Sequence, residues 1–173
     1  MSIQQQLQQT IRDMVDDVQM NNAPLPKIFP PVFALLFAGG MWLLASYFPI
    51  VELISSPWNR LGYLVISVAV LLDLWSLGLF FKAGTTFHPL KPHETSSLVT
   101  NGMYRLTRNP MYLGLVLILT GWAILLSQLT PFFLLPLFVW LINSQQIQHE
   151  ERVLEEMFGD VYGEYKDRVR RWL

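Results

Sequence analysis

The sequence predicts an all-α fold, an integral membrane helical bundle with about four transmembrane helices. Hydrophobic residues occupy 52% of the 173 positions, and charged residues occupy only 14%. The apolar residues are gathered into long runs and do not recur at the short periods typical of a soluble core. A single transmembrane helix needs about 20 apolar residues, and the runs in this chain reach that length.

Three apolar runs supply the four predicted spans. Residues 28–51 contain no charged residue, residues 61–81 contain only Asp73, and residues 111–149 again contain none. The third run is long enough for two spans, and the polar segment 127–131 is where the chain should reverse into a helical hairpin. The predicted spans are residues 30–52, 61–81, 110–127 and 131–149.

The basic residues predict the orientation of the spans. Eleven of the twelve lysines and arginines lie before the first span, between the second and third, or after the fourth, whereas Arg60 lies alone between the first and second. Because cytoplasmic loops carry the excess of basic residues, both termini and the central loop, residues 82–109, are expected in the cytosol. Membrane lipids are then the surroundings, and without a basic domain no nucleic-acid partner is expected.

Amphipathic cytosolic helices are predicted at both ends of the chain. Apolar positions recur at helical spacing in residues 1–20, and this helix could pack on the bundle or lie on the lipid surface. Its polar, Gln-rich start does not resemble a cleaved signal peptide. The tail, residues 150–173, repeats an apolar face and should break around Gly159 and Gly163. The predicted divisions are residues 1–27, an amphipathic helix and connector, and residues 28–173, the membrane domain.

Polar residues mark the predicted start of the third span. Asn109 is a preferred N-cap residue and Pro110 suits the first helical position, so the helix should begin there. The free amides and the dipole of that helix start, with Arg108 beside them, could hold an anion. A plain helix start flanked by membrane-interface anchors explains the same residues, and the residues alone leave both interpretations open.

A polar stripe is predicted on the fourth span. Asn143, Gln146 and Glu150 fall on one helix face and should face protein or a water-filled cavity. Glu150 could then meet an amine or a sulfonium, and Gln146 could hydrogen-bond a polar ligand. For the neighbouring Glu151, Glu155 and Glu156 we expect a solvated boundary face.

Two other groups of polar residues have open roles. Asp73 lies mid-span, where a lone carboxylate costs about 2.5 to 3.5 kcal/mol on insertion scales, so it should face the bundle or water. A catalytic role and a structural hydrogen bond are both open for it, with the candidate partners Ser46, Ser76 and Tyr63. His88 and His93 lack the pattern of metal ligands, and the chain has no cysteine, so no metal site is expected.

Four short motifs follow one another in the second half of the chain. They read L-V-T-N-G-x-Y-R at 98–105, R-N-P-x-Y-L-G at 108–114, E-E-x-x-L at 150–154 and F-G-x-x-Y-x-x-Y at 158–165. Their joint order and spacing resemble the isoprenylcysteine carboxyl methyltransferase family and the related phospholipid methyltransferases, over roughly residues 84 to 173. The resemblance implies a membrane bundle whose cytosolic pocket takes S-adenosyl-L-methionine, with a hydrophobic or lipid-like acceptor entering from the bilayer.

The resemblance also implies site residues. The residues expected to bind the cofactor are Ser96, Ser97, Leu98, Val99, Gly102, Tyr104, Arg108, Asn109, Pro110, Met111, Tyr112 and Glu150. Glu150, Gln146 and Arg108 are the expected catalytic residues. Family members often have His in place of Asn109, and the eukaryotic prenylcysteine enzymes have Arg in place of Gln146. Asn109 can still form the hydrogen bonds of a histidine at that position. With Gln146 in place of an arginine, the chain lacks the group that would recognise a prenylcysteine carboxylate.

The reaction expected from these residues is an in-line methyl transfer, helped by holding donor and acceptor close in a site protected from water. A carboxylate or thiolate acceptor needs no general base. An amine or hydroxyl acceptor needs one, and Glu150 is the candidate. Two other functions fit the sequence less fully. One is a nicotinamide-dependent, sterol-reductase-like membrane enzyme, which would call for more cationic residues, and the other is a small non-catalytic membrane scaffold.

Overall fold

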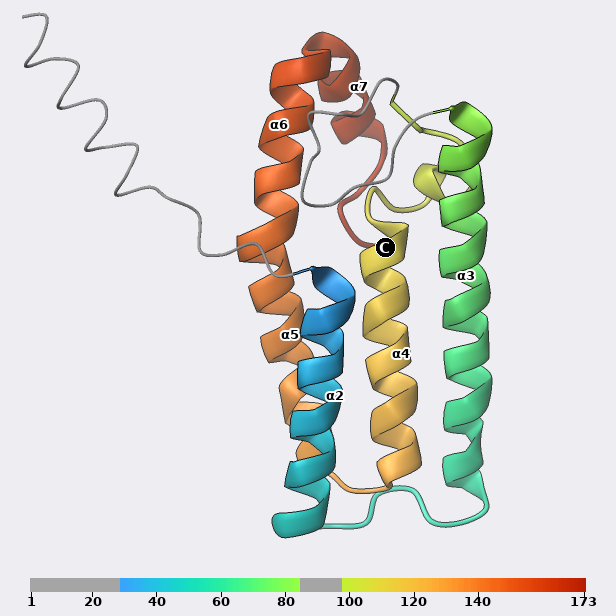
Figure 1. The fold of residues 1–173 in the computed structure, drawn as a ribbon, viewed down its shortest axis with the longest axis vertical. Helices are drawn as coiled ribbons and strands as arrows, with labels where there is room; N and C mark the ends of the chain where they lie inside the picture. Colours follow the sequence, from blue (N-terminus) through green and yellow to red (C-terminus); the bar gives the residue numbers. More distant parts are fainter. Residues whose placement is uncertain (1–28, 85–97) are drawn as a thin grey trace, which may run out of the picture.

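The computed structural model describes residues 29–84 and 98–173, and the regular structure in these ranges is helical apart from one isolated β-bridge (Figure 1). The α-helices are α2 Pro30–Tyr47, α3 Leu61–Ala83, α4 Pro110–Leu126, α5 Leu134–Ile142, α6 Gln148–Phe158 and α7 Asp160–Arg168. Short 3-10 turns at Trp58–Arg60, Gly102–Arg105 and Thr130–Phe133 and a π-helical turn, Asn143–Ile147, complete the elements. The all-α prediction is confirmed for the described residues. The predicted N-terminal helix, Ser96, Ser97, His88 and His93 lie outside them.

Helices α2 to α5 run side by side along the long axis of the molecule (Figure 1). α5 continues through the π-helical turn into α6, which extends beyond the other helices, and α7 turns back from the end of α6 (Figure 1). The chain then descends to the start of α4, where the C-terminus lies (Figure 1). The tail thus returns to residues that precede it by about sixty positions in the sequence.

The closest helix pair is α3 and α4, and two glycines allow it. A Cβ atom built on Gly121 would lie 2.7 Å from the carbonyl oxygen of Gly62, and Gly62 meets the same restriction from α4. The two backbones therefore approach to a distance that any larger residue would prevent, as in other membrane helix pairs with small residues at the crossing.

The core lies where α2, α4 and α5 meet. Met41, Leu119 and Phe138 are buried there, and Phe138 stacks with Phe33 at a ring-centroid distance of 5.6 Å. The indole nitrogen of Trp122 donates to the carbonyl oxygen of Ala38 across the α2–α4 contact. This packing holds α4 between α2 and α3.

The reversal predicted between the third and fourth spans is confirmed. Ser127 follows α4 with a left-handed φ of 64° and turns the chain away from the helix. The amides of Leu53 and Leu129 bond to the carbonyl oxygens of Ser127 and Val51, which ties this turn to the loop after α2. The hairpin and the preceding loop are therefore joined at one end of the bundle.

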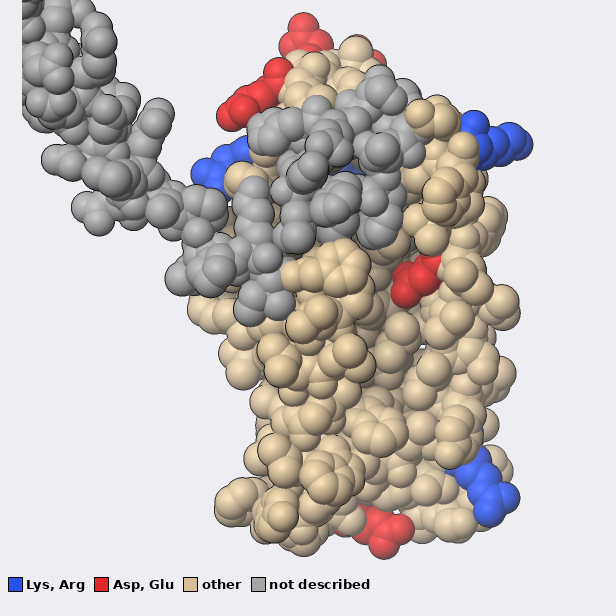
Figure 2. Space-filling view, in the orientation of Figure 1, with Lys and Arg blue, Asp and Glu red and all other residues tan. Residues whose placement is uncertain are grey.

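The surface suits a lipid environment over most of its height. Figure 2 shows apolar and neutral atoms along the middle of the molecule and most charged atoms near its two ends. α2 and the helix Trp58–Ala83 are long and apolar enough to cross a membrane, and their large apolar side chains, such as Leu36 and Leu71, are mostly exposed. α4, with 17 residues, is a shorter apolar helix, and the count of four spans stays a prediction.

Candidate active site

The first turn of α4 and the start of α6 meet through a tyrosine and a carboxylate. The hydroxyl of Tyr112 donates a hydrogen bond of 2.5 Å to Oε1 of Glu150, and the amide of Gln146 donates to the same oxygen at 3.2 Å. Tyr112 and Gln146 are buried and Glu150 is half-buried. The predicted pairing of Gln146 with Glu150 on one helix face is present, and Tyr112 joins it from α4.

Asn143 does not share this cluster, although the sequence placed it on the same helix face. The π-helical turn Asn143–Ile147 adds a residue to the helical period. Spacing counted on an α-helix therefore puts Asn143 on the wrong face relative to Glu150. The Asn143 carboxamide oxygen instead accepts a hydrogen bond of 3.1 Å from Arg171. The predicted stripe is thus divided between two sets of contacts.

Tyr104 lies beside the cluster, on the 3-10 turn that precedes α4. Its ring packs edge-on against Phe80 of α3, with centroids 5.5 Å apart, and its carbonyl oxygen accepts a 2.6 Å hydrogen bond from Tyr165. Burial raises the pKa of Tyr104 well above its ordinary value, and the nearby Tyr165, Glu150 and Asp73 add to the shift. The Tyr104 hydroxyl therefore stays neutral near the carboxylates of Glu150 and Asp73.

The helix start at Asn109 and Pro110 is confirmed, but the side chain of Asn109 does not cap it. α4 begins at Pro110, and Asn109 is its N-cap residue without a side-chain cap bond. The Asn109 carboxamide donates to the carbonyl oxygen of Arg171 at 3.1 Å, and its backbone amide bonds to the hydroxyl of Thr107 at 3.2 Å. The Asn109 side chain is thus bonded to the tail of the chain and not to the amides of its own helix.

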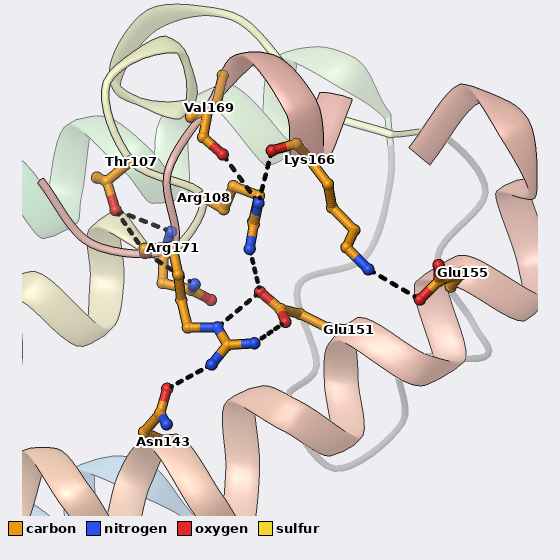
Figure 3. Close-up of polar contacts among 9 residues, drawn as sticks. Thr107, Arg108, Asn143, Glu151, Glu155, Lys166, Val169 and Arg171 are labelled. Atoms are coloured by element: carbon orange, nitrogen blue, oxygen red, sulfur yellow. Dashed lines mark hydrogen bonds and ion pairs between the residues drawn. The ribbon is translucent and has the colours of Figure 1, made fainter. Parts of the chain in front are cut away.

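Arg108 and Glu151 form a buried ion pair (Figure 3). Arg108 Nη2 lies 2.9 Å from Glu151 Oε1, and the side chains are 10% and 8% exposed. Arg108 Nη1 donates to the carbonyl oxygens of Lys166 and Val169 at 3.0 and 2.9 Å. The expectation that Glu151 lies on a solvated face is therefore wrong, because two arginines satisfy its charge inside the protein.

The second arginine of this group is Arg171. Its Nη2 lies 2.5 Å from Glu151 Oε2 and its Nε 3.1 Å from Oε1, so it hydrogen-bonds both carboxylate oxygens (Figure 3). Burial alone raises the pKa of Glu151, but the hydrogen bonds from Arg171 and Arg108 outweigh it and hold that pKa below its ordinary value. We call Arg108, Glu151 and Arg171 the arginine clasp.

Asp73 faces α4 from the middle of α3. A Cβ atom on Gly114 would collide with its carboxylate, so the absence of a side chain at Gly114 provides the space for Asp73. Its Oδ1 atom is buried and has no hydrogen-bond partner in the described structure. The hydrogen bond that the sequence suggested with Ser76 is not formed, because Ser76 donates to the carbonyl oxygen of Leu72.

The other predicted site residues that the structure describes occupy the same end of the bundle. Val99 and Pro110 are buried, Leu98 and Met111 are half-buried, and Gly102 adopts a left-handed φ of 58° under Leu79. Sequence reasoning missed Arg171 and Tyr165. The tyrosine spacing in the tail was a signal for Tyr165, whereas nothing local distinguishes Arg171 from the neighbouring Arg170.

A metal site has no support in the described ranges, where no three His, Cys, Asp or Glu residues lie close enough together to hold an ion. The cluster of Tyr104, Tyr112, Gln146 and Glu150 instead offers aromatic faces, a carboxamide and a carboxylate. Such groups suit a ligand with a cationic centre and polar ends.

Known proteins resemble this chain over the same elements. The phospholipid methyltransferase family model matches residues 58–161. The chain is 34% identical over 91 residues to protein-S-isoprenylcysteine O-methyltransferase of Schizosaccharomyces pombe, and 36% identical over 90 residues to protein-S-isoprenylcysteine O-methyltransferase A of Arabidopsis thaliana. An uncharacterized protein of Haemophilus influenzae is 46% identical over 63 residues, which is 36% of this chain and all of that protein. No solved structure matches the chain.

The matches to the two methyltransferases and to the family model differ in how much of the proteins they cover. The two methyltransferase matches cover 51% and 50% of this chain but only 39% and 46% of the relatives, so the chain spans less than half the length of either enzyme. The family match, in contrast, covers more than half of the chain and includes every helix from α3 to α6. The chain therefore belongs to the phospholipid methyltransferase family of membrane proteins.

Proposed function

We propose that this protein transfers a methyl group from S-adenosyl-L-methionine to a hydrophobic or lipid-like acceptor at the cytosolic face of a membrane. The observation that carries the proposal is the Tyr112–Glu150 contact, which joins two family motifs at one end of the apolar bundle. The names of the relatives support methyltransferase activity. The acceptor atom, O, N or S, stays open.

The cofactor is proposed to lie against the segment from Leu98 to Tyr112 and Glu150. The faces of Tyr104 and Phe80 and the carboxylate of Glu150 suit a sulfonium, which is attracted both to aromatic rings and to negative charge. Ser96, Ser97, Leu98, Val99, Gly102, Asn109, Pro110 and Met111 complete the proposed cofactor-binding set. When bound, the cofactor supplies an electrophilic methyl group, and the residues of the chain orient it.

Arg108 belongs to the proposed pocket mainly through its position. Two nitrogens of its guanidinium are engaged by Glu151 and by two carbonyl oxygens of the tail. Its Nε is buried without a partner in the described structure, so this N–H and the second N–H of Nη2 are left for a polar ligand group. Arg108 is therefore proposed to fix the start of α4 and to offer its remaining donors to a polar group of the cofactor.

Glu150 and Gln146 are proposed to serve the acceptor. An amine or hydroxyl acceptor must lose a proton when it is methylated, and Glu150 can take it as a general base. Tyr112 and Gln146 both donate to Glu150 Oε1 and so fix the direction of the carboxylate. Burial of this end of the bundle excludes water, so that alignment of donor and acceptor supplies most of the rate enhancement.

The membrane topology is part of the same proposal. Four spans, with both termini and the site in the cytosol, agree with the partition of the basic residues. An acceptor dissolved in the bilayer could then reach the site between helices without entering water.

Calorimetry on the purified protein in detergent tests the proposal against its alternatives. S-adenosyl-L-methionine should bind in a saturable way, and the reduced nicotinamide dinucleotide should give no heat beyond dilution. Binding of the dinucleotide alone would favour the sterol-reductase-like alternative. Binding of neither would favour a non-catalytic scaffold and contradict the proposal.

A further inference from the structure

The last residues of the chain form a strap across the start of α4. In this strap, residues 169–172, the carbonyl oxygen of Arg170 accepts the Arg108 amide at 2.9 Å. The carbonyl oxygen of Arg171 accepts from both Thr107 and Asn109, at 3.0 and 3.1 Å. Trp172 then packs against the core cluster that contains Tyr112 and Ile147. The strap is thus fixed by backbone hydrogen bonds, by the arginine clasp and by an aromatic side chain.

The clasp and the candidate site are adjacent connections between the same two elements. Glu151 directly follows Glu150 on α6, and Arg108 precedes Tyr112 by four residues at the start of α4. One connection is the buried Arg108–Glu151 pair and the other is the Tyr112–Glu150 hydrogen bond. The ion pair and the hydrogen bond together therefore set the distance between α4 and α6. Loss of the Arg108–Glu151 pair should then alter the Tyr112–Glu150 hydrogen bond.

The partners of Glu151 show that it does not face a ligand directly. Its two oxygens accept three hydrogen bonds from arginine side chains, and the side chain is 8% exposed. Buried charges of this kind are tolerated only when they are paired and hydrogen-bonded. Its charge is thus used to hold α6, α4 and the strap together.

We propose that Glu151 is a positioning residue for methyl transfer: through Arg108 and Arg171 it fixes α6 against the start of α4 and so holds Glu150 on the Tyr112 hydroxyl. This inference rests on the proposed function. It assigns the two neighbouring glutamates different tasks, since Glu150 meets the reacting groups and Glu151 places Glu150.

Steady-state kinetics and cofactor binding test the assignment. The probes are radiolabelled S-adenosyl-L-methionine with phosphatidylethanolamine vesicles, and separately with a prenylated cysteine acid. Glu151→Gln should lower kcat by about tenfold or more, with the dissociation constant of the cofactor unchanged within about twofold. Glu155→Gln is the matched control, because Glu155 is an exposed glutamate of the same helix that pairs with the half-buried Lys166, and it should match the wild type.

A double variant separates positioning from a plain loss of stability. If Glu151 acts through Glu150, then Glu151→Gln should have little further effect on kcat in a Glu150→Gln background. Independent roles would multiply the two losses, and that result would overturn the inference. An unchanged kcat in Glu151→Gln would do the same, and so would a tenfold weaker cofactor affinity with normal kcat.

A second variant, with one readout that does not depend on catalysis, covers the case in which Glu151→Gln folds poorly. Arg171→Gln removes a partly exposed member of the clasp and leaves the Arg108–Glu151 pair, so it should lower kcat by about threefold or more. Limited trypsin digestion should release residues after Arg168 at least about fivefold faster than in the wild type, as read by mass spectrometry. Equal release and equal kcat would overturn the inference. A wild-type protein that methylates neither acceptor would instead contradict the proposed function itself.

Discussion

The hydroxyl of Tyr112 lies 2.5 Å from Oε1 of Glu150, across the contact between α4 and α6. The two residues are 38 positions apart in the sequence, yet both lie within the range that the family model matches. Tyr112 is buried, and its hydroxyl donates a hydrogen bond to the carboxylate, so it fixes the orientation of Glu150 and leaves the carboxylate charged. The contact thus connects the proposed cofactor segment to the proposed acceptor group.

Replacing Tyr112 with Phe should reduce methyl transfer and preserve the fold. The variant keeps the ring in the core cluster and removes one hydrogen bond to a charged group, which is worth about 1.5–3 kcal/mol. We expect kcat to fall by a corresponding factor of about 10 to 150 and the melting temperature to fall by several degrees, while the far-ultraviolet circular dichroism spectrum matches that of the wild type. The same rate as in the wild type would show that the hydroxyl has no part in the reaction.

Cofactor affinity should respond to Tyr104 and Arg108 and much less to Arg105. Tyr104→Ala removes a buried ring beside Phe80 and should weaken S-adenosyl-L-methionine binding by about 0.5–2 kcal/mol, the range for a cation resting on an aromatic face. Arg105 is exposed and lies outside these contacts, so Arg105→Ala is the control. Calorimetric titration measures all three variants.

Arg108→Ala should weaken binding too, but it should also destabilise the protein. Removing one partner of a buried ion pair typically costs about 3–5 kcal/mol, because the other charge is left uncompensated. The melting temperature should therefore fall in Arg108→Ala and stay constant in Arg105→Ala. Normal stability of Arg108→Ala would show that the clasp is not a stabilising contact.

The arginine clasp predicts a pH dependence of stability. The folded-state pKa of Glu151 lies below its unfolded value, so the unfolded state binds the proton more readily and the clasp contributes fully above the ordinary glutamate pKa of about 4.3. This contribution is lost as the pH falls from there through the lower folded-state pKa. Melting temperatures from pH 7 to pH 3.5 should show a wild-type advantage over Glu151→Gln that shrinks with acidification. A constant advantage would contradict this assignment of charge.

The topology can be tested with reporter fusions. Fusions after Pro57 and Gln128 should report the external side, and a fusion after Lys91 should report the cytosol, because eleven of the twelve basic residues lie before the first span, between the second and third, or after the fourth. A cytosolic signal at Gln128 would contradict the assignment of 110–127 and 131–149 as a membrane-spanning hairpin.

The sequence predicted what depends on local patterns. Pro110 begins α4 because proline suits the first helical turn, and the reversal at Ser127 follows from the polar break between two apolar runs. Gln146 and Glu150 meet because residues four apart share a helix face. These features needed no knowledge of the rest of the chain.

Features that depend on distant contacts could not be predicted in this way. Glu151 was expected on a solvated face, because its partners, Arg108 and Arg171, are 43 and 20 residues away in the sequence and local spacing does not reveal them. Asn109 was expected to cap its own helix, but the returning strap supplies a carbonyl oxygen 62 residues away. The π-helical turn after α5 shifted Asn143 toward Arg171, since helical spacing assumes an unbroken period.

The most direct test of the account is methyl transfer by Glu150→Gln, measured with radiolabelled S-adenosyl-L-methionine across a range of pH. The variant should bind the cofactor yet lose most transfer to a hydrophobic acceptor, while Glu155→Gln should match the wild type. With an amine or hydroxyl acceptor, the wild-type rate should rise with pH through the ionisation of Glu150, and this limb should vanish in the variant. Equal incorporation by Glu150→Gln and the wild type at every pH would contradict the role of Glu150 and with it the proposed site.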